Sequence, residues 1–220
     1  GNTVLDFDSE EKRRKSSVSS AMAALEWDNT KLNIIDAPGL FDFEGGAAEA
    51  VRAAEAVLIV TSAGSGVDVG TEKAFRAADK KGAAKFFAVT KTDSDHRNFY
   101  KTFDALKEVY GNKLCPTIIP YMEGNITKCY VNLMTGMAFS YDENGKATKV
   151  PVPEDSVIEE MTSAFMEAVA TTDDALMEKF FEGEKFTKEE ILKGLCIGIF
   201  DGSIYPVYAL SGLTCAGVDQ

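Results

Sequence analysis

Leu32-Asn33-Ile34-Ile35-Asp36-Ala37-Pro38-Gly39 is the stretch of this 220-residue chain that decides the fold class. Its apolar run ends in an aspartate, as at the carboxyl end of a buried strand in an open α/β sheet, where such sheets place their ligand chemistry. A carboxylate there can hold Mg²⁺ through water, and a glycine lets a backbone N–H approach a phosphate because no Cβ intervenes. Asp-Ala-Pro-Gly also describes an ordinary turn after a strand, so the neighbouring segments must distinguish the two readings.

Two further apolar segments, Ala56–Thr61 and Lys85–Val89, predict strands on the carboxyl side, and each follows a helical pattern. Alternating strands and helices predict an α/β fold with a mostly parallel sheet, in which these strands are buried on both faces. The second strand runs directly into Thr90-Lys91-Thr92-Asp93. A last apolar strand near the end of the chain runs into Leu210-Ser211-Gly212-Leu213.

These three motifs at strand ends, in this order, resemble those of the nucleotide-binding GTPases. Thr90–Asp93 corresponds to their Asn-Lys-x-Asp loop, and Leu210–Leu213 is similar to their Ser-Ala-x loop. Over nearly its whole length, the chain resembles the ribosome-associated translational GTPases, specifically elongation factor G and the elongation-factor-G-like proteins. The segments that carry this wider resemblance are Asn33–Gly39 with Phe41–Phe43, the helix containing Glu72 and Arg76–Lys80, and Leu176–Phe180 with Gly183-Glu184.

The resemblance implies a P-loop-GTPase-like fold and a guanine-nucleotide site for GTP or GDP. The Asp93 carboxylate would accept two hydrogen bonds from guanine, and the stem of Lys91 would pack on the purine. Thr90 stands where Asn is usual; its hydroxyl keeps one hydrogen bond but the second donor of the amide is lost, which predicts a lower affinity for guanine. The expected nucleotide-binding residues are Asp36, Gly39, Thr90, Lys91, Asp93, Ser211, Gly212 and Leu213.

Residues 1–20 are polar and lack a sustained apolar period, which predicts that they are largely loop. By resemblance this segment is switch I, which folds over the nucleotide and Mg²⁺, and Arg14-Lys15-Ser16-Ser17 stands where family members carry Arg-Gly-Ile-Thr. Ser17 would then bind Mg²⁺ together with Asp36. A disordered, serine-rich tail is the alternative interpretation.

Two features of the family's GTPases are missing from the sequence. No Gly-x-x-x-x-Gly-Lys-[Ser/Thr] phosphate loop precedes switch I, and Gly145-Lys146-Ala147-Thr148 lacks the leading glycine and predicts a hairpin turn instead. Elongation factor G has His directly after Asp-x-Pro-Gly, whereas this chain has Leu40, which cannot orient a water or transfer a proton. The only histidine, His96, lies in a charged turn and is expected to be a surface residue. We therefore expect no catalytic residue and an inactive isolated chain without a bound cofactor, although an intact parent would be a GTPase.

From about residue 112, alternating segments predict antiparallel strands followed by two helices. Placed between the base loops of a parallel domain, these elements predict an insert, which by resemblance is the extra subdomain of elongation factor G that contacts the ribosomal stalk. We expect a truncated GTP-binding domain at 1–111 and 204–220, and an inserted α+β subdomain at 112–203. The elements expected in the insert are strands at Thr117–Pro120, Cys129–Leu133 and Gly136–Ser140, and helices at Val157–Phe181 and Lys188–Phe200.

Composition limits the classes of partner and compartment. The net charge of −12 disfavours direct nucleic-acid binding by a broad basic face, and no apolar run approaches the length of a membrane helix. The basic cluster Lys12–Lys15 is either a solvated loop or a binding patch. The four cysteines are widely spaced without a C-x-x-C pattern, which favours neither zinc nor disulfides and fits a reducing cytoplasm.

In the GTPases that the chain resembles, another strand lies between the strands equivalent to Leu32–Asp36 and Val57–Thr61. Because both segments are apolar on both faces, unpaired backbone groups along such a gap would be costly. We expect either direct pairing of the two strands or a strand donated by another molecule, for example from Gly1–Phe7, which would give a strand-swapped oligomer.

Two functions remain open at this stage. The first is the guanine-nucleotide-binding domain of a ribosome-associated, elongation-factor-G-like GTPase, which would meet the stalk and the factor-binding site of the ribosome. The second is a non-hydrolysing protein-interaction module with a vestigial nucleotide pocket. The missing phosphate loop, Leu40 and Thr90 favour the second for the isolated chain, whereas the density of family motifs favours the first for its parent.

Overall fold

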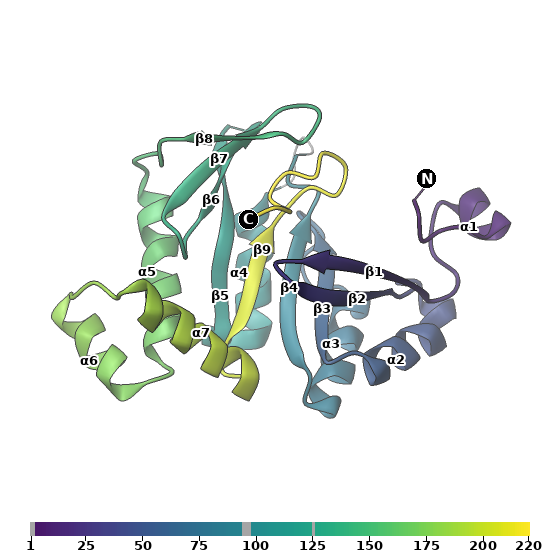
Figure 1. Ribbon diagram of the computed structural model, residues 1–220, viewed down its shortest axis with the longest axis horizontal. Coiled ribbons are helices and arrows are strands. Elements are labelled where there is room, and N and C mark those ends of the chain that lie inside the picture. Colours follow the sequence, from purple (N-terminus) through teal and green to yellow (C-terminus); the bar gives the residue numbers. More distant parts are fainter. Residues whose placement is uncertain (1–2, 94–97, 125) are drawn as a thin grey trace. The chain divides into compact units, whose positions relative to one another are not determined.

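The computed structural model describes residues 3–93, 98–124 and 126–220, which form two compact units (Figure 1). The first unit comprises Gly1–Val57 and Val69–Ala83, and the second comprises Leu58–Asp68 and Ala84–Gln220. Each unit is described by itself. The expected surface position of His96 lies outside the described residues.

The first unit contains a β-hairpin and helices. Strands β1 and β2 pair antiparallel, with Leu25 opposite Leu32. Asp28 and Asn29 turn the chain between them with positive φ, a conformation that Asp and Asn tolerate better than most residues and that two-residue hairpins require. The elements are α1 (Ser9–Arg14), β1 (Ala21–Trp27), β2 (Thr30–Asp36), the 3₁₀-helix η1 (Phe41–Phe43), α2 (Glu44–Ala53) and α3 (Val69–Lys81).

Strand β2 differs from the buried interior strand that its apolar sequence predicts. Leu32 and Ile34 are 43% and 44% exposed. Within the described residues β2 pairs with β1 alone, in a two-stranded sheet, whereas the strand that contains Val57–Thr61 belongs to another sheet. The expected direct pairing of these two strands is therefore wrong.

The second unit is built on a seven-stranded sheet in the order β3-β4-β9-β5-β6-β7-β8, which can be followed in Figure 1. Neighbouring strands β4, β9 and β5 run parallel, whereas β5 to β8 run antiparallel. The expected α/β class is confirmed, and the antiparallel strands continue the parallel sheet instead of forming a separate one. The strands are β3 (Ala56–Ser62), β4 (Ala84–Thr90), β5 (Leu114–Glu123), β6 (Ile126–Asn132), β7 (Met137–Tyr141), β8 (Ala147–Val150) and β9 (Tyr205–Ala209).

Strands β3 and β4, both predicted to be buried on both faces, differ in how much of their side chains is exposed. Strand β4 is buried as expected, with Phe87, Ala88 and Val89 at most 1% exposed. Strand β3 is an edge strand that pairs with β4 alone in the described sheet, and its Leu58 and Val60 are 55% and 60% exposed. An edge strand loses the neighbour that would cover it, so a continuous apolar run does not guarantee burial.

Helices of the second unit contact this sheet, and α7 lies against β4 and β9. The single helix expected at Val157–Phe181 is two helices. It breaks because Asp173 caps a new helix, its carboxylate accepting a hydrogen bond from the Ala175 N–H. Among the described helices, none combines the length and apolar composition needed to cross a bilayer. The helices are α4 (Phe99–Tyr110), the 3₁₀-helix η2 (Gly111–Lys113), α5 (Ser156–Ala170), α6 (Asp174–Glu182) and α7 (Lys188–Asp201).

Residues 3–20 are largely loop, as predicted, apart from the six-residue helix α1, which the sequence analysis did not expect. Asp8 accepts a hydrogen bond from the Glu10 N–H, and Glu11 reaches back to the Asp8 N–H, which completes a capping box. The helix ends at Lys15, whose φ of 57° is left-handed. Such a conformation suits glycine and strains any residue with a Cβ.

Replacing Lys15 by glycine should therefore stabilise α1, by up to about 1 kcal/mol. Hydrogen exchange at the Ser16 N–H, which bonds to the Glu11 carbonyl, should slow by up to roughly fivefold. Lys12→Gly is the matched control: it places glycine inside the same helix, where it should cost about 1 kcal/mol and speed exchange. Equal effects of the two variants would contradict the assignment of strain to Lys15.

Candidate functional site

Two loops expected to recognise a purine base meet at one edge of the sheet. Strands β4 and β9 are parallel neighbours with Val89 opposite Ala209, and parallel strands bring their carboxyl ends to the same edge. The Leu210 N–H donates to the Val89 carbonyl at 3.0 Å. The structure therefore brings the segments Thr90–Asp93 and Ser211–Leu213 together at the shared edge of β4 and β9.

The first loop turns its charged side chains outward around one buried residue. Lys91 and Asp93 are exposed, whereas Thr92 between them is 2% exposed. Lys91 has a φ of 59°, which is uncommon for a residue other than glycine. Thr90 uses its hydroxyl within the sheet, donating to the Thr61 carbonyl of β3 at 3.2 Å. The loop thus presents a carboxylate and an aliphatic stem that ends in a cation.

The second loop is closed by a buried serine. Ser211 is fully buried, and its Oγ accepts hydrogen bonds from the N–H groups of Leu213 at 3.3 Å and Thr214 at 3.2 Å. Its own N–H donates to the Ala216 carbonyl at 2.9 Å. Gly212 and Leu213 are exposed at the tip. Both lone pairs of the serine hydroxyl therefore fold the loop, and the exposed residues at its tip are accessible to a ligand.

Asp36, Gly39 and Ser17, the other residues expected at the site, belong to the first unit. Ser17 Oγ donates to Asp6 Oδ1 at 2.9 Å. Asp36 is half-buried, and its pKa is raised by burial and by the negative charges of Asp6 and Glu11. The sequence analysis missed Asp6, because a single acidic residue in a polar segment carries no local signal.

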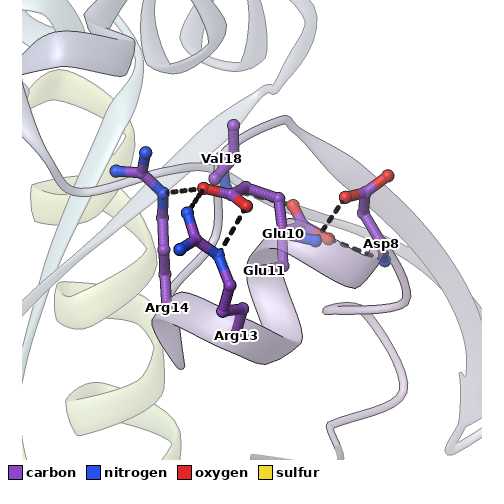
Figure 2. Close-up of polar contacts among 6 residues, drawn as sticks. All are labelled: Asp8, Glu10, Glu11, Arg13, Arg14 and Val18. Atoms are coloured by element: carbon purple, nitrogen blue, oxygen red, sulfur yellow. Dashed lines mark hydrogen bonds and ion pairs between the residues drawn. The ribbon is translucent and has the colours of Figure 1, made fainter.

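Glu11 organises the segment that contains Ser17 (Figure 2). Its side chain is 1% exposed. Its Oε1 accepts from the N–H groups of Val18 at 3.0 Å and Ser19 at 3.2 Å, and its Oε2 accepts from the Asp8 N–H at 3.2 Å. These hydrogen bonds lower the pKa of Glu11, because they favour the ionised carboxylate.

The basic cluster Lys12–Lys15 is partly neutralised within α1. Arg13 donates to Glu10 at 2.9 and 2.6 Å, and Arg14 pairs with the same carboxylate (Figure 2). The two arginines lower the pKa of Glu10 to about 2. The cluster is therefore the end of a short helix and not the solvated loop of the first interpretation, and no observation tests whether it is a binding patch.

Removing the charge of Glu11 should loosen the chain between α1 and β1. In Glu11→Gln, the amide group cannot replace the charge-assisted acceptor, so hydrogen exchange at the Val18 and Ser19 N–H groups should speed up by about tenfold or more. The folded-state pKa is lowered, so the carboxylate stabilises the fold above its ordinary pKa of 4.5, and this stabilisation should fade as the pH falls below that value.

Glu10→Gln is the control for that experiment, because Glu10 lies on the same helix but binds side chains of arginine. Its removal should leave exchange at Val18 and Ser19 nearly unchanged. Equal protection of these two N–H groups in Glu11→Gln and in the wild-type chain would show that Glu11 does not hold the segment.

Leu40, which directly follows the Asp-x-Pro-Gly motif, is 49% exposed and precedes the short helix η1. Its side chain offers neither a proton nor a hydrogen-bond acceptor. Among the described residues, no group of three or more His, Cys, Asp or Glu side chains is arranged to hold a metal ion. The polar groups at the expected site residues are those of the loops Thr90–Asp93 and Ser211–Leu213 in one unit, and the Ser17 and Asp36 oxygens with Asp6 in the other.

Comparisons with known proteins agree on a family. Residues 1–220 match the family model described as the elongation factor Tu GTP binding domain. The sequence is 30% identical over 220 residues to the elongation factor G-like protein of two Mycobacterium tuberculosis strains, CDC 1551 / Oshkosh and H37Rv. That similarity covers 99% of this chain, which spans 30% of the length of these relatives. A crystal structure from Thermus thermophilus superimposes with a TM-score of 0.89 at 32% identity, over 99% of this chain and 33% of that one.

Proposed function

Because the chain belongs to the elongation factor Tu GTP-binding domain family, we propose that it is the guanine-recognising part of a ribosome-associated translation factor of the elongation factor G type. The observation that carries this proposal is the convergence of Thr90–Asp93 and Ser211–Leu213 at the shared edge of β4 and β9. Both loops belong to one compact unit, and the residues at their tips are exposed.

The exposed carboxylate of Asp93 supports recognition of guanine over adenine. Guanine presents two adjacent donors, its N1–H and its amino group, to a carboxylate that can accept both. Adenine has an acceptor at N1, which would face the same carboxylate without a proton between them. The aliphatic stem of Lys91, which is exposed beside Asp93, can cover one face of the purine while its ammonium group stays in water.

We further propose that Ser17 and Asp36, both in the first unit, hold Mg²⁺. Hydroxyl and carboxylate oxygens are the ligands that Mg²⁺ prefers. Ser17 can continue to donate its proton to Asp6 while a lone pair of its Oγ faces the ion. Burial raises the pKa of Asp36, and the negative charges of Asp6 and Glu11 raise it further; bound Mg²⁺ would favour the ionised carboxylate.

The proposed division keeps residues 1–111 and 204–220 as the GTP-binding part and 112–203 as an inserted subdomain. In the proposed role the insert meets the stalk of the ribosome, the remainder meets the factor-binding site, and the protein works in the cytoplasm. The parent would be the GTPase. We propose no catalytic residue in this chain, because the hydrocarbon side chain of Leu40 cannot carry a proton.

Nucleotide titration of the natural protein that carries this chain tests the proposal. GDP should bind at least about a hundredfold more tightly than ADP, since two charge-assisted hydrogen bonds are at stake. Equal affinities for GDP and ADP would refute guanine recognition. A non-hydrolysing interaction module with a vestigial pocket remains the second candidate, favoured by Leu40, whose side chain cannot orient a water, and it predicts no preference between the two nucleotides.

A further inference from the structure

We infer that Thr92 and Tyr130 form a hydroxyl clamp that holds the two base loops in their binding geometry. This inference rests on the proposed recognition of guanine. Tyr130 lies on β6, which is separated from β9 in the sheet by β5. Its hydroxyl nevertheless lies 2.7 Å from Thr92 Oγ1, in the middle of the first base loop. Thr92 and Tyr130 are positioning residues, because their hydroxyls act on the loops and not on a nucleotide.

Which hydroxyl donates in each hydrogen bond of the clamp follows from the number of protons that each group carries. Thr92 Oγ1 lies 3.1 Å from the carbonyl oxygen of Leu210, which can only accept. The single hydroxyl proton of Thr92 is therefore used there, and the Tyr130 hydroxyl must donate to Thr92 Oγ1. Burial raises the pKa of Tyr130, so the phenol keeps the proton that it donates.

The two hydrogen bonds, from Tyr130 to Thr92 and from Thr92 to Leu210, connect both base loops to the Tyr130 hydroxyl. Thr92 lies between Lys91 and Asp93, and Leu210 directly precedes Ser211. Strand β6 holds Thr92 a second time, because the Thr127 hydroxyl donates to the Thr92 carbonyl at 2.7 Å. Both the side chain and the main chain of Thr92 are thus fixed from the same strand.

The backbone of the first loop needs such support. Lys91 is held at a φ of 59°, a conformation that persists in residues other than glycine when the surroundings enforce it. Thr92 is the next residue along the chain, so its anchors restrict the turn that carries Lys91 and aims Asp93. Without them, Lys91 can relax and the Asp93 carboxylate loses its fixed direction.

Tyr130 is itself rigidly seated. It is 4% exposed, and its ring and that of Tyr141 form a T-shaped pair with a centroid distance of 5.6 Å and an interplanar angle of 85°. Gly217 passes close to it: a Cβ there would lie 3.3 Å from Tyr130 Cδ1 and 2.7 Å from the Ala209 carbonyl oxygen. Because packing restricts the ring to one orientation, its hydroxyl has a fixed position and can hold Thr92 in place.

The test compares Tyr130→Phe and Thr92→Val with Thr92→Ser and Tyr100→Phe in the natural protein that carries the chain. Tyr130→Phe removes one hydroxyl from a buried ring. Thr92→Ser keeps the hydroxyl and should rescue the loss caused by Thr92→Val. Tyr100→Phe is the matched control, since the Tyr100 hydroxyl donates to the Pro120 carbonyl and touches neither base loop.

Titrations with GDP and ADP should show that Tyr130→Phe lowers the affinity for GDP about five- to tenfold, as expected for one buried hydrogen bond. The affinity for ADP should hardly change, because adenine does not donate hydrogen bonds to the Asp93 carboxylate. Thr92→Val should lower the affinity for GDP at least as much, and the double variant should lose less than the product of the two single losses. The Tyr100→Phe control should lower the melting temperature while keeping the GDP-to-ADP ratio.

Hydrogen exchange in the 220-residue chain without nucleotide supplies an independent readout. Exchange at the N–H groups of Leu210 and Leu213, which donate to the Val89 carbonyl and to Ser211 Oγ, should speed up in Tyr130→Phe but not in Tyr100→Phe. If the wild-type protein bound GDP and ADP equally, guanine recognition would be refuted, and this exchange pattern would still decide whether the clamp exists. Unchanged exchange and an unchanged GDP-to-ADP ratio in a folded Tyr130→Phe variant would overturn the inference.

Discussion

The 220-residue chain alone is expected to bind GTP with a Kd of about 1 mM or weaker. In GTPases of the family that it resembles, the phosphate loop provides backbone N–H groups, a lysine charge and a Mg²⁺ ligand. The sequence 1–220 contains no Gly-x-x-x-x-Gly-Lys-[Ser/Thr] segment, so these contacts have no source in the chain. What would remain is the proposed recognition of the base by the two loops.

The size of the expected loss follows from the kind of bonds involved. Hydrogen bonds to charged phosphate oxygens contribute about 1.5–3 kcal/mol each, so losing three of them would weaken binding by roughly 10³- to 10⁶-fold. Titration with a fluorescent GTP analogue measures this directly. A micromolar Kd for the 220-residue chain would show that other residues bind the phosphates.

Asp93→Asn is the substitution with the largest expected effect on base selectivity. The amide that replaces the carboxylate can accept from guanine N1–H, but it turns a donor toward the guanine amino group. We therefore expect the natural protein that carries the chain to lose about 10²- to 10⁴-fold in affinity for GDP. Xanthosine diphosphate has a carbonyl in place of that amino group, so the variant should bind it better than the wild type does.

Asp104→Asn is the matched control, because Asp104 is an exposed aspartate of α4 in the same unit. It removes the same charge away from the loops and should leave the affinities for both nucleotides unchanged. Isothermal titration with GDP and xanthosine diphosphate measures the six affinities of the wild type and the two variants. A GDP affinity in Asp93→Asn equal to that of the wild type would remove Asp93 from the base site.

The sequence predicted the features that local patterns encode. Apolar runs that end in polar residues located β4, β9 and the loops that follow them, and the structure brings these loops together. The exposure of β2 and β3 could not be predicted in this way. Whether an apolar strand is covered depends on its neighbours in the sheet, and these are set by the topology of the whole chain.

Helix α1 and the Thr92–Tyr130 clamp differ in whether a local sequence pattern could have predicted them. Helix α1 had a local signal, because Asp8 and Glu11 have the spacing of a capping box, and the polar composition of the segment concealed it. The clamp had no local sequence signal, because Thr92 and Tyr130 are 38 residues apart. Thr92 occupies the variable position of its loop motif, and Tyr130 belongs to no motif. Their contact is a product of the fold.

The continuity of the seven-stranded sheet has a consequence for how the second unit loses its structure. Strand β5 pairs with β9 from Leu114 and with β6 up to Glu123, and Ile118 has a partner on both sides, Tyr208 and Asn132. A deletion of residues 112–203 would therefore remove a central strand and leave β9 with an open edge. The antiparallel part and the base loops should consequently melt in one cooperative transition, as a single foldon, and not as a detachable module beside a surviving core.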